Sequence, residues 1–230
     1  YLISGRTTYS NWIFRLIDDP SIRRSRASFY DLNARLTYDL NRNNKLELSS
    51  YLSNDAFRFN SDTVYSYDNK IFSLRWRHFF NSRFFSVTTI NKSSYTYDVS
   101  SERNPSEAFV LSHRINSTGF KSDFNWYQGR HEVNYGLDLV HYKVNPGSYL
   151  PSGDSSLVVP RRIAWEKAIE TALYIEDKFI LNEIVSLNAG IRFSTFHSIG
   201  PGEVMIYDPD YPRSVSTIVD TLFFSGNSIF

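Results

Sequence analysis

Histidines and carboxylates are the residue types in this chain that could act as metal ligands or acid–base catalysts. Glu176 and Asp177 are adjacent, so on a strand their carboxylates point to opposite faces and cannot work as an acid–base pair. The chain contains no cysteine, no Gly-x-Ser-x-Gly sequence and no glycine-rich phosphate loop. The histidines are not spaced at i, i+2 or i, i+4 from one another, as local metal sites require; they are His78, His113, His131, His141 and His197. The sequence therefore predicts no catalytic centre, resident metal or cofactor, with a metal site assembled across strands as the alternative.

Charged residues in this chain recur at every second position of strand-like segments. In residues 28–40, Leu32 and Leu36 share one face, while Asp31, Arg35 and Asp39 share the other, which is the period-2 pattern of a β-strand. A face with so many charges requires contact with water, because an unpaired buried charge is costly. The same reasoning assigns a set of charged residues to the water side of the predicted strands: Arg35, Glu47, Asp55, Arg75, Arg77, Glu132, Asp138 and Arg192.

The elements that position these residues are roughly nine or ten predicted strands. Short turns are expected at residues 41–44, 81–83, 127–130 and 181–184, alternating with long loops at 10–27, 59–69, 98–108, 144–161 and 198–214. In residues 109–126 the apolar positions change parity, from Phe109, Leu111 and Ile115 to Phe120 and Phe124. That change predicts a β-bulge at residues 117–119.

Composition bounds the class of protein. The 230 residues contain 25 Lys+Arg against 24 Asp+Glu, a balance that gives no signal for nucleic-acid binding. The mean hydropathy is −0.36 although 17% of the residues are aromatic. A polar mean with many aromatics is typical of a transmembrane β-barrel, and short turns alternating with long loops are typical of outer-membrane barrels. No apolar run reaches the ~20 residues of a membrane helix. A soluble antiparallel sandwich is the alternative.

Two segments carry a more specific pattern. Residues 172–193 combine Tyr174, the acidic pair Glu176 and Asp177, a short turn, and a strand that ends with Gly190, Ile191, Arg192 and Phe193. This pattern resembles a barrel strand pair of TonB-dependent outer-membrane transporters, and YLISGRTTY at residues 1–9 is similar to a barrel strand of their Bacteroidetes-type members. The resemblance extends over most of the chain only as a rhythm of strands and turns.

The resemblance implies that residues 1–230 form one section of an antiparallel transmembrane β-barrel. The remaining strands and the plug domain of such a transporter are not in this sequence. It also implies energy-coupled uptake of a bulky nutrient, such as an iron chelate, glycan or peptide, across a Gram-negative outer membrane. The implied partners are outer-membrane lipid, the TonB system through the plug, and optionally a surface lipoprotein. On this interpretation the eight charged residues contact the solute or the plug, because mixed charges around a wet channel influence which solutes pass.

Two other functions fit the same residues. The chain could be a complete small barrel that acts as an enzyme or adhesin, in which case the first and last strands pair. It could also be a soluble all-β binding module, in which case Leu32, Leu36, Leu187 and Ile191 are buried against a second sheet. For the aromatics a structural role is expected, as an interfacial girdle made of Trp12, Tyr38, Trp76, Phe80, Trp126 and Trp165.

Overall fold

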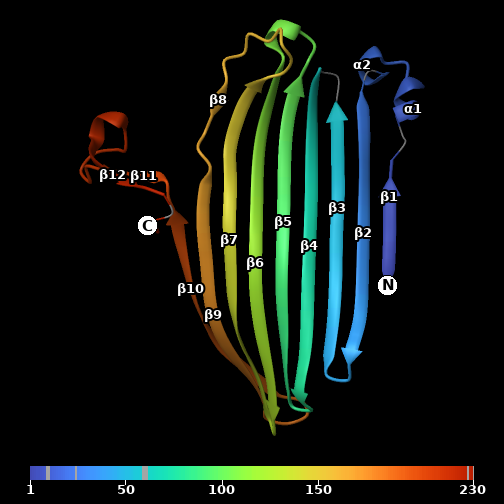
Figure 1. Ribbon diagram of the computed structural model, residues 1–230, viewed down its shortest axis with the longest axis vertical. Coiled ribbons are helices and arrows are strands. Elements are labelled where there is room, and N and C mark those ends of the chain that lie inside the picture. The colour runs from blue at the N-terminus through green and yellow to red at the C-terminus, as the bar shows by residue number, and fades with distance from the viewer. Residues whose placement is uncertain (9–10, 24, 59–61, 227, 230) are drawn as a thin grey trace.

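A computed structural model of the protein describes residues 1–230 apart from 9–10, 24, 59–61, 227 and 230. Its main element is a ten-stranded antiparallel sheet that extends along the long axis of the molecule (Figure 1). The strand order is β1-β2-β3-β4-β5-β6-β7-β9-β10, and the short β8 pairs with β7. The predicted all-β antiparallel fold of nine or ten strands is confirmed.

The central strands of this sheet are 15 to 21 residues long, well beyond the ~10 residues that cross a bilayer. The strands of the large sheet are β1 (Leu2–Thr7), β2 (Arg26–Asn41), β3 (Asn44–Arg58), β4 (Thr63–Asn81), β5 (Phe84–Ser101), β6 (Phe109–Gln128), β7 (His131–Pro151), β8 (Arg161–Arg162), β9 (Glu166–Ile180) and β10 (Ser186–Ile199).

The four predicted short turns all lie at one end of the sheet, which is the lower end in Figure 1. Asparagine side chains close three of them. Asn41 Oδ1 accepts from the backbone N–H of Asn43 at 2.9 Å, and Asn81 Oδ1 accepts from that of Arg83 at 2.9 Å. We call this the turn end of the sheet and the opposite end the mouth end.

The mouth end carries the longer connections, which contain α1 (Asn11–Arg15), α2 (Pro20–Arg23), the 3-10 helix η1 (Pro105–Glu107) and β8. None of the described helices is both long and apolar enough to cross a membrane. Beyond β10, the strands β11 (Gly202–Tyr207) and β12 (Ile218–Phe224) pair as a separate two-stranded sheet, with the 3-10 helix η2 (Val215–Thr217) between them.

Three of the predicted loops are too long. Most of the loop expected at 59–69 is strand, because β4 begins at Thr63 and Tyr65 already pairs with Phe57; residues 59–61 lie outside the described part. The loop expected at 144–161 is also strand as far as Pro151, and the loop expected at 198–214 contains β11. These strands continue into polar sequence because backbone pairing extends beyond the segment in which apolar and polar residues alternate.

The bulge expected at residues 117–119 is wrong. Pairing between β5 and β6 is unbroken from Phe84–Trp126 to Ser101–Phe109. The register shift in this region instead lies between β6 and β7, at Ser112 and Arg114. Pro146 stands in the shifted part of β7, and since proline has no N–H it cannot continue the ladder. Along β6 the types of residue on each face change. Side chains at even and odd positions nevertheless keep pointing to the same two faces.

The register sorts side chains onto two faces. Leu36, Leu48 and Leu74 are paired across β2, β3 and β4 on one side, which we call the apolar face. The next positions along these strands, including Glu47 and Arg75, form the charged face on the other side. Leu36 is 53% exposed and Ile191 72% exposed, and among the described residues the buried apolar side chains are Ala108 and Ala172. Leu32, Leu36, Leu187 and Ile191 are therefore not packed against a second sheet, contrary to the soluble-module alternative.

The edges of the large sheet also bear on the small-barrel alternative. β1 pairs with β2 and β10 pairs with β9, and within the described part of the chain the register contains no pairing of β1 with β10. These two strands are the edges of the sheet (Figure 1). An exposed edge leaves backbone N–H and C=O groups for further strands to pair with.

Gly129 allows a direct test of the β6–β7 turn, because its φ of +61° lies in the left-handed region. We expect Gly129→Ala to lower the free energy of unfolding by about 1–2 kcal/mol, since a Cβ is disfavoured there. Gly129→Asn should cost clearly less, because asparagine tolerates this conformation better than other residues. Denaturant unfolding of the two variants under identical conditions checks the order, and equal costs would contradict the turn geometry.

Candidate functional site: the charged face

All eight charged residues predicted to meet water lie on the charged face of the sheet. Along β2 to β4 the register brings Glu47 opposite both Thr37 and Arg75, and Arg77 opposite Lys45. On the same face, among strands β7, β9 and β10, Glu132 stands opposite Lys178 and Arg192 stands opposite Tyr174. Between the two groups, β5 presents neutral residues at the corresponding positions, which are Val87, Thr89, Asn91 and Ser93. The predicted set therefore occupies one face, but Arg35, Glu47, Arg75 and Arg77 lie apart from Glu132, Asp138 and Arg192, and Asp55 lies nearer the mouth end of β3.

Glu47 is the centre of the first group. Its Oε1 lies 3.6 Å from Arg35 Nη2 and 3.9 Å from Arg75 Nη1. One carboxylate thus stands between two guanidinium groups, and Arg77 on the same face adds a further positive charge. The excess positive charge of this group favours an anionic contact. Because both arginines are about half exposed, each ion pair contributes little to stability.

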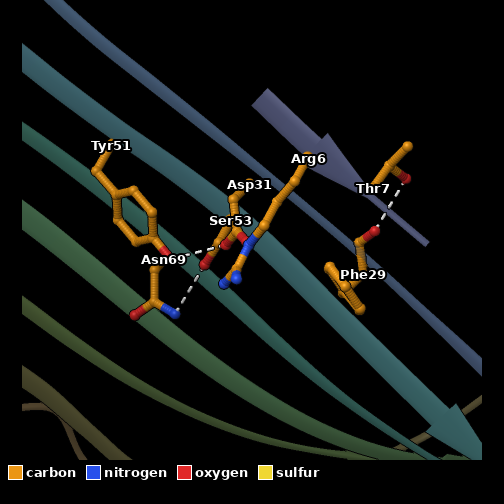
Figure 2. Close-up of polar contacts among 7 residues, drawn as sticks. All are labelled: Arg6, Thr7, Phe29, Asp31, Tyr51, Ser53 and Asn69. Atoms are coloured by element: carbon orange, nitrogen blue, oxygen red, sulfur yellow. Dashed lines mark hydrogen bonds and ion pairs between the residues drawn. The ribbon is translucent and has the colours of Figure 1, made fainter. Parts of the chain in front are cut away.

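A third group, which was not in the predicted set, lies where β1 joins the sheet (Figure 2). Asp31 binds the Arg6 guanidinium through Oδ2 and accepts from the Tyr51 hydroxyl at 2.8 Å through Oδ1. Next to it, Ser53 is 2% exposed and its Oγ accepts from Asn69 Nδ2 at 3.2 Å. These bonds tie β1, β2, β3 and β4 together through side chains. Asp55, from the predicted set, lies one position further along the charged face of β3.

The second group of the predicted set is built around Tyr174. Its hydroxyl donates to Asp123 Oδ1, while the Lys121 ammonium lies 5.6 Å and the Arg192 guanidinium 5.5 Å from the centre of its ring. Arg192 Nη2 also lies 3.7 Å from Asp138 Oδ2. The ring therefore contacts two cations, each of which has a carboxylate partner, since Lys121 Nζ also lies 3.2 Å from Asp123 Oδ1. The sequence singled out Tyr174 only as part of the barrel-strand pattern and did not single out Asp123. The contact between them joins strands that are not adjacent in the sheet.

A glycine makes room for this ring. Gly136 stands opposite Tyr174 in the register, and a Cβ at that position would lie 2.5 Å from both the Tyr174 hydroxyl and the Ser122 carbonyl oxygen. Only a residue without a side chain lets Tyr174 cross β7 and reach Asp123 on β6. The signal in the sequence is a lone glycine within a strongly alternating strand.

The remaining chemistry-bearing residues are dispersed. Glu176 and Asp177 point to opposite faces, as predicted: Glu176 Oε1 accepts from Asn134 Nδ2 at 3.2 Å on the charged face, and Asp177 Oδ2 lies 2.6 Å from His131 Nδ1 on the apolar face. Glu132 pairs with Lys178 at 3.1 Å. In the described part of the chain no three His, Cys, Asp or Glu side chains come together as a metal site.

At the mouth end, the charged face becomes aromatic. Tyr67 lies 6.2 Å from Phe57 and 4.9 Å from Tyr97 between ring centres, and Tyr97 lies 6.0 Å from His113. These stacked rings run from β3 to β6. On the opposite side of the same strand ends, the apolar face becomes polar, with Ser66 and Asp68. The alternation of the two faces is therefore inverted near the mouth.

Comparison with known proteins gives a match at the level of fold. No family model and no curated protein matches the chain. A solved copper transporter, OprC, aligns with a TM-score of 0.63 and 11% identity over 86% of this chain. The ferric preacinetobactin receptor BauA from Acinetobacter baumannii aligns with a TM-score of 0.53 and 10% identity over 76% of this chain. The ferric-catecholate import receptor Fiu from E. coli K12 gives 0.56 and 13% over 90%.

These alignments establish the class of fold. The chain forms a section of an antiparallel transmembrane β-barrel, and its sheet matches the solved barrels of transport and import proteins. It spans 33%, 34% and 42% of the length of the three matched chains.

The close approach at Gly136 predicts a selective effect of one methyl group. We expect Gly136→Ala to lower the free energy of unfolding by about 1–3 kcal/mol, because the new Cβ must displace backbone or the Tyr174 ring. Gly5→Ala is the matched control, since a Cβ there meets its nearest atoms at ordinary contact distances of 3.5 and 3.6 Å. Denaturant unfolding in one detergent measures both. Similar losses in the two variants would contradict the steric argument.

Proposed function

We propose that the chain is part of the barrel wall of a TonB-dependent outer-membrane transporter that takes up a bulky nutrient. The observation that carries the proposal is the separation of the two faces: exposed leucine and isoleucine on one side, paired charges on the other. A sheet with no core of its own is stable only if its apolar face meets hydrocarbon and its charged face meets water. The fold shared with solved transport proteins supports the same function.

If this function is correct, each end of the sheet lies on a defined side of the membrane. Outer-membrane barrels have short turns on the periplasmic side and longer loops outside. The turn end, with Asn41 and Asn81, then faces the periplasm, and the mouth end faces the exterior. Aromatic residues on the apolar face near the turn end, which are Tyr38, Trp76, Phe80 and Trp126, sit where an interfacial girdle is expected.

The charged face borders the path of the solute in this proposal. The arginines around Glu47 and the group around Tyr174 contact either the solute or a plug domain, as proposed for Arg35, Glu47, Asp55, Arg75, Arg77, Glu132, Asp138 and Arg192. Their mutual ion pairs hold the side chains in place and keep the wall close to neutral. At the mouth, the rings of Phe57, Tyr67 and Tyr97 offer an apolar surface for first contact with a bulky solute.

A metal chelate is the class of solute that the comparisons favour. The three matched structures are a copper transporter, a ferric preacinetobactin receptor and a ferric-catecholate import receptor. Glycans and peptides are the other bulky nutrients to be tested. Energy would come from the TonB system through a plug domain, and a surface lipoprotein is a further partner to be sought.

A gene-deletion experiment tests the function. Cells that lack the gene should grow poorly when one chelate, glycan or peptide is the limiting source, and the full-length gene should restore growth. Deletion of TonB in the complemented strain should abolish the growth again. Outer-membrane fractions should contain the protein. Growth that is independent of TonB, or recovery of the protein without membrane, would contradict the proposal.

The assignment of the two faces predicts unequal effects of the same substitution at adjacent positions. Leu36→Arg places a charge on the apolar face and should cost about 2–4 kcal/mol if that face meets the middle of the bilayer. Thr37→Arg places the same charge on the water side opposite Glu47, and its cost should be within about 0.5 kcal/mol.

The measurement is denaturant unfolding of the full-length variants inserted in phosphatidylcholine vesicles. The two substitutions change the net charge equally and lie on the same strand, so each is the control for the other. Equal costs at Leu36 and Thr37 would contradict the assigned faces.

A further inference from the structure

The charged face contains one level that carries no charge. Its mouth side borders the row of Arg6 and Asp31 (Figure 2), and two rows toward the turn end lie Glu47 and Arg75. From β1 to β6 the register aligns the neutral level in a row of Ser4, Asn33, Tyr51, Ile71, Ser93 and Ser117. A band made mainly of hydroxyl and amide groups therefore lies between two charged levels.

Two cavities adjoin where this band crosses β1 to β4. One has a volume of about 350 Å³, and the other, of about 190 Å³, extends toward Arg6 and Asp31; both are lined by Ser4, Asn33 and Tyr51. The larger one falls in the range of about 300–1,000 Å³ that is usual for small-molecule sites. We call this space the neutral groove and define it by Leu2, Ser4, Asn33, Ser49, Tyr51 and Ile71.

The protein itself does not use the polar side chains of the neutral groove. Within the described part of the chain, the side chains of Ser4, Asn33 and Ser49 form no hydrogen bond with another residue. By contrast, Ser53 and Asn69 in the next row bond to each other at 3.2 Å. Hydroxyl and amide groups both donate and accept hydrogen bonds. The groove therefore offers unused donors and acceptors on a face that is assigned to water.

Two apolar side chains lie beside these polar groups. Leu2 is 56% exposed and Ile71 is 41% exposed, although both are on the charged face. Neither has an apolar core to enter. A ligand that is polar at its edge and apolar on its faces would cover both kinds of side chain at once.

Tyr51 supplies a fixed ring at the same place. Its hydroxyl donates to Asp31 Oδ1 at 2.8 Å, which anchors the far end of the side chain (Figure 2). At the mouth, the rings of Tyr67 and Tyr97 stack on each other with centres 4.9 Å apart, whereas in the described part of the chain Tyr51 stacks on no other ring. The Tyr51 ring borders both cavities and is free to contact a ligand.

We propose that the neutral groove binds a pyranose ring of a neutral glycan. The inference rests on the proposed function and deepens it, since it selects one class among the bulky nutrients. A pyranose has hydroxyl groups around its edge and C–H groups on its faces, which match the free amide and hydroxyl groups beside a tyrosine ring.

The charges around the groove argue against an anionic chelate at this place. Arg6 binds Asp31, and Arg35 lies 3.6 Å from Glu47, so both neighbouring cations already have a carboxylate partner. The proposed class differs from the solutes of the three matched structures, with which this chain shares a fold at 10–13% identity.

Four neutral tetrasaccharides are the probes: maltotetraose, cellotetraose, mannotetraose and xylotetraose. We expect the full-length protein, in a detergent without a sugar headgroup, to bind at least one of them in isothermal titration calorimetry. Asn33→Ala should weaken this binding roughly 5- to 100-fold, because a sugar hydroxyl loses its partner. Tyr51→Leu should weaken it roughly 3- to 10-fold, and Tyr51→Phe, which keeps the ring, should weaken it less.

The matched control is Asn188→Ala. Asn188 is an exposed asparagine on the charged face of β10, and within the described residues its side chain also forms no hydrogen bond. This variant should bind the tetrasaccharide like the unmodified protein, and thermal unfolding verifies that all variants are folded. Binding of none of the four probes, or equal weakening by Asn33→Ala and Asn188→Ala, would overturn the proposal. Binding of a ferric tris-catecholate that is weakened by Asn33→Ala would also overturn it.

Failure of this inference can be distinguished from failure of the proposed function. If no tetrasaccharide binds while the gene still restores TonB-dependent growth on a chelate or peptide, the assignment of the groove is wrong and the transport function stands. Tetrasaccharide binding that depends on Asn33, in a protein whose growth phenotype does not depend on TonB, would contradict the transport function alone.

Discussion

Backbone pairing from β2 to β7, continuous apart from one register shift between β6 and β7 and shifts beside two of the turns, is the interaction on which the rest of this structure depends. Because each hydrogen-bonded pair fixes the direction of the next side chain, a continuous ladder holds every second residue on one face for the whole length of a strand. The ladder of β5 and β6 has no interruption over eighteen residues of β5. The face on which a side chain lies is therefore set by the whole sheet. A change in residue type along one face then indicates that the medium next to that face changes.

That principle explains what the sequence could predict. Alternation in residues 28–40 and the turn residues Asn41 and Asn81 predicted β2, its partner and the turns, because period and turn chemistry are local properties. The same alternation placed all eight charged residues on one face. The strand ends were missed where local composition is polar, as at Thr63 to Asn69, because the partner strand rather than the local sequence decides whether pairing continues.

Other parts of the site depend on register, which a single sequence does not contain. Tyr174 reaches Asp123 across β7 only because Gly136 lies between them, and three strands must be aligned before that contact can be anticipated. The expected bulge near Gly119 failed for a related reason. The apolar residues Phe109 and Ile115 lie on the same face as Lys121. The parity change in the sequence therefore marks the height at which the two faces of the sheet exchange residue types.

The exchange of character occurs on both faces of the sheet. Beyond Phe72 and Ile90, toward the mouth end, lysine follows the large apolar residues on the apolar face, while the rings of Tyr67 and Tyr97 stack on the charged face. A strand that ended at the membrane surface would need neither change. A strand that continues into water needs polar side chains outside, and its inner rings then stack with one another across strands, where each pair contributes beyond its buried area. Both changes occur toward the mouth end, so one boundary accounts for the lysines on the apolar face and the aromatic rings on the charged face.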